Sequence, residues 1–182
     1  VVINFFLVAT RYGMVLLGSY RNFTLNSTVP RELFFASNIM IHGYKLVVEL
    51  LLCLGVSMYL DLFSGQALIL MVPLVLGFFS FTLGIIFIFA IIFCFVRDIR
   101  HIWELVSRPL VFASPIFYSL DQLSGWEANL IYVCNPLTPF IVAFRDVLMR
   151  GDNIHWVNYG YCLFWGGGML ALGYSFFLRF EY

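Results

Sequence analysis

The sequence predicts an all-α fold, a polytopic bundle of transmembrane helices that forms one domain over residues 1–182. The first observation is a run without any charged side chain from Leu62 to Val96. About 20 apolar residues cross the roughly 30 Å hydrocarbon core of a bilayer, so this run is long enough for a span with interfacial ends. The second is composition: 62% of the residues are hydrophobic and 11% are charged, which leaves too little polar surface to cover a water-soluble core. The third is a net charge of zero, which argues against nucleic acid as a partner because such proteins carry a basic face.

The apolar stretches between charges predict five crossings, at residues 1–20, 33–60, 67–96, 103–120 and 156–178. Arg11 interrupts the first, and Pro109 and Pro115 interrupt the fourth. The chain opens inside an apolar stretch, with neither an initiator Met nor a basic leader. We therefore expect a fragment that lacks the first span and an N-terminal cytoplasmic segment of a six-span subunit.

Orientation is predicted from Lys and Arg in the short loops, because positively charged loops stay in the cytoplasm. One set of loops carries six such residues and the opposite set carries two: Arg21, Arg31, Arg97, Arg100, Arg108 and Arg179 against Arg145 and Arg150. The count places residues 21–32, residues 97–104 and the C-terminus in the cytoplasm. The segment 120–155 is then external.

The external segment keeps two apolar helical stretches, 126–133 and 140–149, which are split by Asn135, Pro136 and Pro139. Each stretch is too short to span a bilayer, and Pro disfavours helix at the residue before it. The pattern predicts a re-entrant or interfacial helical hairpin that could act as a lid or vestibule. A pair of amphipathic surface helices is the alternative.

Several ionisable side chains fall inside the predicted spans, and four of them are candidates for a substrate path. His42, Lys45 and Glu49 share one face of the second span by helical spacing. Mutual neutralisation of Lys45 and Glu49 is the simplest account, and a path for a polar substrate is the functional one. Arg11 is a similar candidate, although its long side chain could reach an interface instead.

The sequence contains no motif that indicates a catalytic site or a metal site. The four cysteines form no Cys-x-x-Cys pair, and no His lies at ligand spacing from them. The chain has no Gly-x-Ser-x-Gly elbow and no Gly-rich phosphate loop with Lys. We expect no catalytic residue, no metal and no cofactor. Gly166, Gly167 and Gly168 in the last span predict close helix packing or flexibility.

Three local patterns resemble one family. The first is Leu25-Asn-Ser-Thr-Val-Pro30-Arg31-Glu32, and the second is Phe95-Val-Arg97-Asp98. The third, and the most specific, is Ser114-Pro115-Ile-Phe-Tyr118, followed by Asn135-Pro136 and by Phe144-Arg145. Together they resemble the type 2 ABC transporter permeases of the polysaccharide export family, over nearly the whole chain.

The resemblance implies a homodimeric permease in the bacterial inner membrane that works with two copies of a cytoplasmic ATP-binding subunit. Its family exports lipid-linked glycans such as O-antigen or teichoic acid. The residues expected to contact the ATPase are Arg21, Pro30, Arg31, Glu32, Arg97, Asp98 and Arg100. Plain positive-inside anchoring of these loops needs no partner and stays open. Other open alternatives are an ABC permease for a drug or lipid and an ion-coupled carrier that uses His42, Lys45 and Glu49.

Aromatic rings would suit the lining of a glycan path, because they stack on the faces of sugars. The candidates near the external mouth are Tyr118, Trp126 and Tyr132, and an ordinary interfacial aromatic belt is the alternative. Arg145 does not share a helical face with Asp146. It could pair elsewhere or contact a phosphate or carboxylate of the glycan.

Overall fold

The computed structural model describes residues 1–19, 32–60, 65–115, 125–126, 131–132, 135–149 and 155–180. Regular structure in these ranges is helical, with no strand among the described residues. In chain order the helices are α1 (Val2–Gly13), α2 (Leu16–Ser19), α4 (Glu32–Tyr59), α5 (Gly65–Phe95), α6 (Ile99–Ala113), α8 (Thr138–Met149) and α9 (Trp156–Phe180). The all-α prediction is confirmed.

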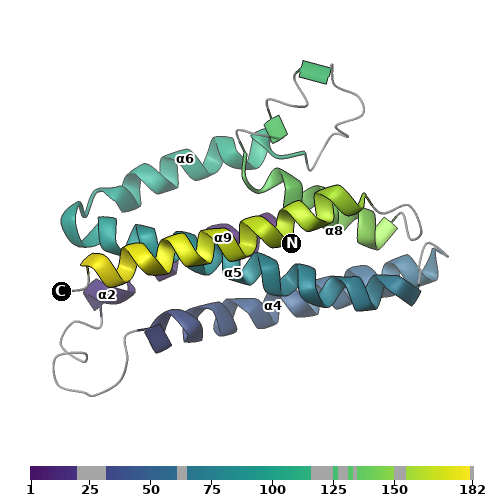
Figure 1. The fold of residues 1–182 in the computed structure, drawn as a ribbon, viewed down its shortest axis with the longest axis horizontal. Helices are drawn as coiled ribbons and strands as arrows, with labels where there is room; N and C mark the ends of the chain where they lie inside the picture. The colour runs from purple at the N-terminus through teal and green to yellow at the C-terminus, as the bar shows by residue number, and fades with distance from the viewer. Residues whose placement is uncertain are drawn as a thin grey trace.

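Three helices run side by side along the long axis of the molecule: α4, α5 and α9 (Figure 1). Among the described residues these three are long and apolar enough to cross a membrane, over Glu32–Tyr59, Leu68–Phe95 and Trp156–Phe180. They correspond to the predicted spans 33–60, 67–96 and 156–178. A shorter apolar helical stretch, Val2–Gly18, occupies the first predicted span.

Helix α6 covers the first part of the fourth predicted span, 103–120. The helix begins at Ile99, and its first turn carries Arg100 and His101 on an exposed face, where an amphipathic helix tolerates charge. Residues 116–120 of that predicted span lie outside the described residues. The total of five crossings therefore stays a prediction.

Helices α5 and α9 run in the same direction and pack backbone against backbone. The hydroxyl of Tyr159 donates to the carbonyl of Leu70 at 2.8 Å, across 89 positions. The same offset pairs Gly77 with Gly166 and Gly84 with Gly173. A Cβ added at Gly173 would lie 2.7 Å from the Gly84 Cα, and one at Gly166 would lie 3.0 Å from the Gly77 Cα.

These glycine pairs recur every seven residues, which is the repeat that keeps two helices in register along a shared seam. We call the four residues the glycine seam. Nothing lies within 4 Å of a Cβ added at Gly167 or Gly168, so only the first glycine of the triplet packs against α5. The packing interpretation is confirmed at Gly166.

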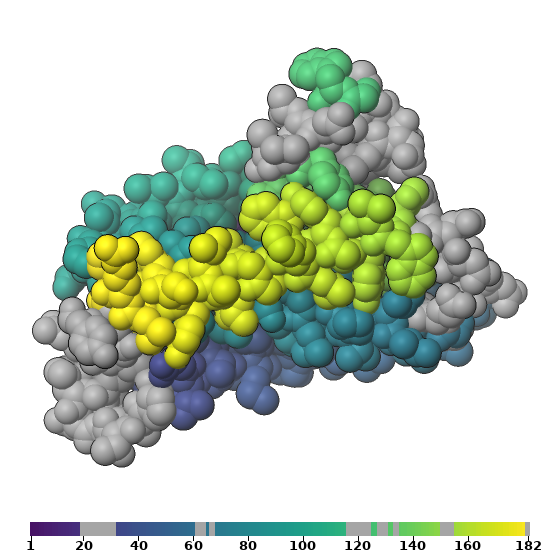
Figure 2. Space-filling view, in the orientation of Figure 1, coloured from purple at the N-terminus to yellow at the C-terminus, as the bar shows by residue number. Residues whose placement is uncertain are grey.

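The interior around the seam is built largely from phenylalanine. Phe35 lies edge-on to Phe87 and to Phe177, with centroids 4.9 and 5.6 Å away, and so joins α4, α5 and α9. Helix α9 lies over α5 on the face shown in Figure 2, with α6 along one edge and α4 along the other. The outward face of α4 carries apolar side chains, including Met40, Ile41, Tyr44, Val48, Leu51 and Leu52, as expected of a helix that faces lipid.

Helix α8 starts deep in the bundle. Phe140 in its first turn packs against Phe78 and Phe81, whose ring centroids lie 5.2 and 5.1 Å away, near the middle of α5. At the other end of α8, the Leu148 carbonyl accepts a hydrogen bond from Ser57, close to the end of α4, at 2.9 Å. The helical stretch predicted at 140–149 is confirmed, with a start at Thr138. Re-entry of the hairpin into a bilayer stays a prediction.

Candidate functional site

Four of the residues predicted to contact an ATPase are described, and they lie at one end of the bundle, where α4 begins and where α5 and α9 end (Figure 1). Glu32 is the first residue of α4 and is partly exposed. Arg97 and Asp98 form the exposed turn between α5 and α6, and Arg100 is exposed in the first turn of α6. Three further candidates lie outside the described residues: Arg21, Pro30 and Arg31.

The candidate path residues of α1 and α4 line two neighbouring pockets that share His42. A pocket of about 90 Å³ is lined by Lys45 and Glu49 together with Asn4 of α1. A larger pocket, of about 550 Å³, is lined by Arg11 and Tyr12 of α1 and by residues of α4, with Arg100 of α6 at its edge. The rings of Tyr12 and His42 stack with centroids 5.3 Å apart. The structure therefore brings Arg11, His42, Lys45 and Glu49 to one polar strip between α1 and α4.

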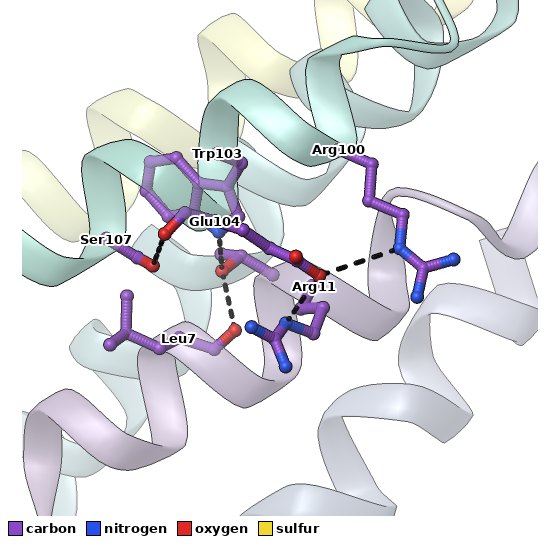
Figure 3. A network of polar contacts seen from close by, with 7 residues as sticks. Leu7, Arg11, Arg100, Trp103, Glu104 and Ser107 are labelled. Carbon is purple, nitrogen blue, oxygen red and sulfur yellow. Dashed lines mark hydrogen bonds and ion pairs between the residues drawn. The ribbon is translucent and has the colours of Figure 1, made fainter.

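The expected neutralisation of Lys45 by Glu49 is not seen. In the part of the chain that the structure describes, ion pairs within 4.0 Å involve Arg11, Arg100 and Glu104 instead. Arg11 Nε lies 3.5 Å from Glu104 Oε1, and Arg100 Nε lies 3.8 Å from the same oxygen (Figure 3). One carboxylate thus serves two guanidinium groups from α1 and α6.

A second contact holds the same two helices together. Trp103 Nε1 donates to Thr10 Oγ1 at 3.1 Å, and the Thr10 hydroxyl lies 3.2 Å from the carbonyl of Leu7 (Figure 3). The same hydroxyl donates to the carbonyl of Phe6 at 2.7 Å. The Trp103 ring also stands edge-on to Phe6, with centroids 6.0 Å apart. Helix α6 is therefore fixed to α1 by an aromatic contact, a hydrogen bond and an ion pair.

Sequence reasoning missed Glu104, Trp103 and Thr10 as parts of this site. The one local signal was the spacing of Arg100 and Glu104, four residues apart on a helix, which places them side by side. Contact of Glu104 with Arg11 depends on how α6 packs against α1, which no spacing in the sequence encodes.

Two halves of the most specific sequence pattern meet in space. Asn135 Nδ2 donates to Ser114 Oγ at 2.7 Å, and the Leu137 backbone N–H donates to Asn135 Oδ1 at 3.0 Å. Asn135 is buried, and the bond to Leu137 organises the turn that precedes α8. Pro136 is exposed in that turn. The predicted break at Asn135 and Pro136 is confirmed, and it doubles as a clasp between α6 and α8.

Of the remaining candidates, Tyr132 lies beside the first turn of α9. Tyr132 lines a pocket of about 370 Å³ with His155, Asn158 and Tyr161, and its hydroxyl donates to Asn158 Oδ1. Burial is the main reason that the pKa of Tyr132 rises to about 12, so its phenol stays protonated and can donate. Trp126 is exposed, and Tyr118 lies outside the described residues.

Arg145 is partly buried on α8 and lines an apolar pocket of about 480 Å³ between α8, the start of α1 and the second half of α4. This pocket is separate from the strip that holds Arg11 and His42. The structure therefore does not gather all the predicted path residues at one place.

A family model and two known proteins similar to this chain all belong to membrane transporters. The family model of the ABC-2 type transporter matches residues 2–149. Similar proteins include two O-antigen export system permease proteins RfbA of Klebsiella pneumoniae. One is 28% identical over 163 residues, which cover 84% of this chain and 59% of the relative. The other is 25% identical over 157 residues, with the same two coverages.

The chain thus spans 59% of the length of these relatives. The family match extends from α1 to the end of α8, and it includes the α1–α6 contact and the clasp at Asn135. This chain is an integral membrane protein that belongs to the ABC-2 type transporter family.

Proposed function

We propose that the chain is the membrane-spanning permease subunit of an ATP-driven exporter that moves a lipid-linked polysaccharide across the bacterial inner membrane. The observation that carries this proposal is the family match over residues 2–149 together with two relatives named as O-antigen export permeases. Both relatives cover 84% of the chain, so the likeness extends over most of the fold.

In the proposed assembly the permease is a homodimer with two copies of a cytoplasmic ATP-binding subunit. We propose this partner as the source of energy, and residues 1–182 carry no Gly-rich phosphate loop with Lys. The surface proposed to receive the partner is the bundle end where Glu32 starts α4 and where Arg97 and Asp98 join α5 to α6. This end and the C-terminus are assigned to the cytoplasm by the excess of Arg in its loops.

Glu32 is suited to transmit movement of the ATPase, because it stands at the start of a 28-residue helix. A push on its carboxylate acts along α4, whose buried Phe35 contacts both Phe87 and Phe177. In the proposed cycle, ATP-driven closure of the partner is transmitted in this way and parts the two permeases, and the polymer passes between them.

The test replaces Glu32 with Ala in the full exporter, reconstituted with its ATPase. A contact to a charged group contributes about 1.5–3 kcal/mol, so its loss should lower partner-stimulated ATP hydrolysis and glycan export by roughly tenfold or more. Membrane insertion should not change. Glu32→Asp keeps the carboxylate and serves as the matched control, with a smaller loss expected.

Export and stimulated hydrolysis that remain at the wild-type level in Glu32→Ala would remove this residue from the mechanism. Surface glycan measured in cells that lack their own permease tests the cargo directly. Failure to restore surface glycan, with the ATPase still bound and stimulated, would favour an ABC permease for a different lipid or drug.

An ion-coupled carrier is the second candidate, and one observation favours it. His42, Lys45 and Glu49 line a single pocket at membrane depth beside Asn4, and ionisable groups inside a membrane commonly mark proton or substrate paths. Transport that persists without the ATPase and collapses with the proton gradient would support the carrier over the exporter.

A further inference from the structure

We infer that the pocket between α1, α4 and α6 binds the phosphate headgroup of a lipid, with Arg11 and Arg100 as the residues that hold the phosphate. The inference deepens the proposed function and rests on it in so far as the bound lipid is the carrier of the exported glycan. Residues that line the pocket come from all three helices, and its volume is about 550 Å³.

The charge in this pocket is unbalanced. Arg11 and Arg100 share the single carboxylate of Glu104, at 3.5 and 3.8 Å. Both distances exceed the 2.7–2.9 Å of a charge-assisted hydrogen bond. Two guanidinium groups against one carboxylate leave one positive charge to be neutralised.

The orientation of the guanidinium groups suits an incoming phosphate. Each ion pair runs through Nε, so the terminal nitrogens are turned away from Glu104 (Figure 3). Guanidinium groups bind phosphate through a planar fork of donors. Among the described residues, the ion pairs of Arg11 and Arg100 engage Nε, which leaves the terminal nitrogens available for that geometry. Side chains of Arg11 and Arg100 are about half exposed, at 50% and 51%, and so are accessible to a ligand.

The walls of the pocket indicate a lipid rather than a small soluble anion. Val15, Leu16, Phe34 and Ile41 supply apolar surface next to the cationic groups. Ile41 is 58% exposed on the outward face of α4, beside Met40 and Tyr44. A ligand in this pocket therefore meets positive charge at one side and a lipid-facing helix at the other, which matches an anionic headgroup with an apolar tail.

Binding would act on the contact between α1 and α6. A phosphate that takes the guanidinium forks competes with Glu104, and this weakens the ion pair that joins the two helices. The hydrogen bond from Trp103 to Thr10 is independent of that charge and would remain. Helix α6 begins directly after Arg97 and Asp98, which the proposed function places against the ATPase. Headgroup binding is thereby linked to the position of the helix that follows this turn.

The experiment uses the full permease with its ATPase in lipid nanodiscs, and measures binding of two probes. The first is geranylgeranyl pyrophosphate, which carries a pyrophosphate on an isoprenoid tail, and the second is phosphatidylglycerol in nanodiscs of phosphatidylcholine. Arg11→Gln and Arg100→Gln should each weaken binding by roughly tenfold. Arg108→Gln is the matched control, since Arg108 is exposed on the same helix and does not line the pocket.

Loss of pyrophosphate binding in both variants but not in the control supports the inference with the glycan carrier as the source of the phosphate. The same pattern with phosphatidylglycerol alone supports a membrane phospholipid as the source. Equal binding of both probes by all variants overturns it. Glu104→Gln provides a second route if either Arg variant misfolds: loss of the competing carboxylate should tighten binding severalfold, and unchanged or weaker binding contradicts the inference.

Failure of this inference is distinguishable from failure of the proposed function. Glycan export by the wild type, with probe binding unaffected in Arg11→Gln and Arg100→Gln, would refute the headgroup site alone. Absence of glycan export, with Arg-dependent binding of either probe, would refute the proposed cargo alone.

Discussion

The glycine seam between α5 and α9 makes a sharp prediction for Gly173→Ala. The added Cβ would lie 2.7 Å from the Gly84 Cα, whereas ordinary van der Waals contact begins at about 3.4 Å. The two backbones would have to separate by at least about 0.7 Å, and no side-chain rotation can relieve the clash because Gly84 has no side chain.

Forcing extra volume into a packed interface costs about 1–3 kcal/mol. For a chain of 182 residues, each kcal/mol lowers Tm by about 2–4 °C. We therefore expect Gly173→Ala to lower Tm by roughly 2–12 °C, measured by intrinsic fluorescence during heating in detergent micelles. Separation at this point should also loosen the neighbouring pair of Gly77 and Gly166, so the upper part of this range is the better expectation.

Gly167→Ala is the matched control, because it makes the same chemical change on the same helix with nothing within 4 Å of the new Cβ. Replacing Gly by Ala in a helix stabilises it by about 0.5–1 kcal/mol when space allows. Its Tm should stay constant or rise. A Gly173→Ala protein as stable as Gly167→Ala would refute the close backbone approach.

Two further predictions concern the clasp and the orientation. Asn135→Ala removes the hydrogen bonds to Ser114 and to the Leu137 N–H, and a buried N–H left unsatisfied costs about 1–3 kcal/mol, so Tm should fall. Asn135→Ser keeps a hydroxyl at this position and should lower Tm less. A Tm equal to that of the wild type in Asn135→Ala would mean that the clasp does not stabilise the bundle. In single-cysteine variants, a membrane-impermeant maleimide should label exposed Cys94 from the cytoplasmic side and should spare buried Cys162. Labelling of Cys94 from the outside would invert the proposed orientation.

The long spans could be predicted from sequence because the bilayer acts locally. An uncharged run of this length has to satisfy its own backbone hydrogen bonds, and only a helix does so within one segment. This is why the predicted span 67–96 and the observed helix Gly65–Phe95 differ by so little. The first turn of α6 lies before the apolar run of the predicted span, because this turn is charged and amphipathic and hydropathy alone does not register it as helix.

Contacts between distant segments could not be predicted in the same way. Three consecutive glycines in α9 point to different sides of the helix, since successive residues turn by about 100°. Only the register with α5 decides that Gly166 packs while Gly167 does not. The partner of Arg11 is likewise decided by the packing of α1 against α6, which lie 93 positions apart at the bond from Trp103 to Thr10.

The Asn135 clasp has a consequence for how related chains can vary. Because Ser114 and Asn135 meet at a hydrogen bond, the two ends of the intervening stretch of chain are held together. Doubling the length of a flexible loop whose ends are held together costs only about 0.6 kcal/mol of closure entropy. Insertions between Ser114 and Asn135 should therefore leave α6 and α8 in place, and we expect related proteins to differ in chain length between these two positions.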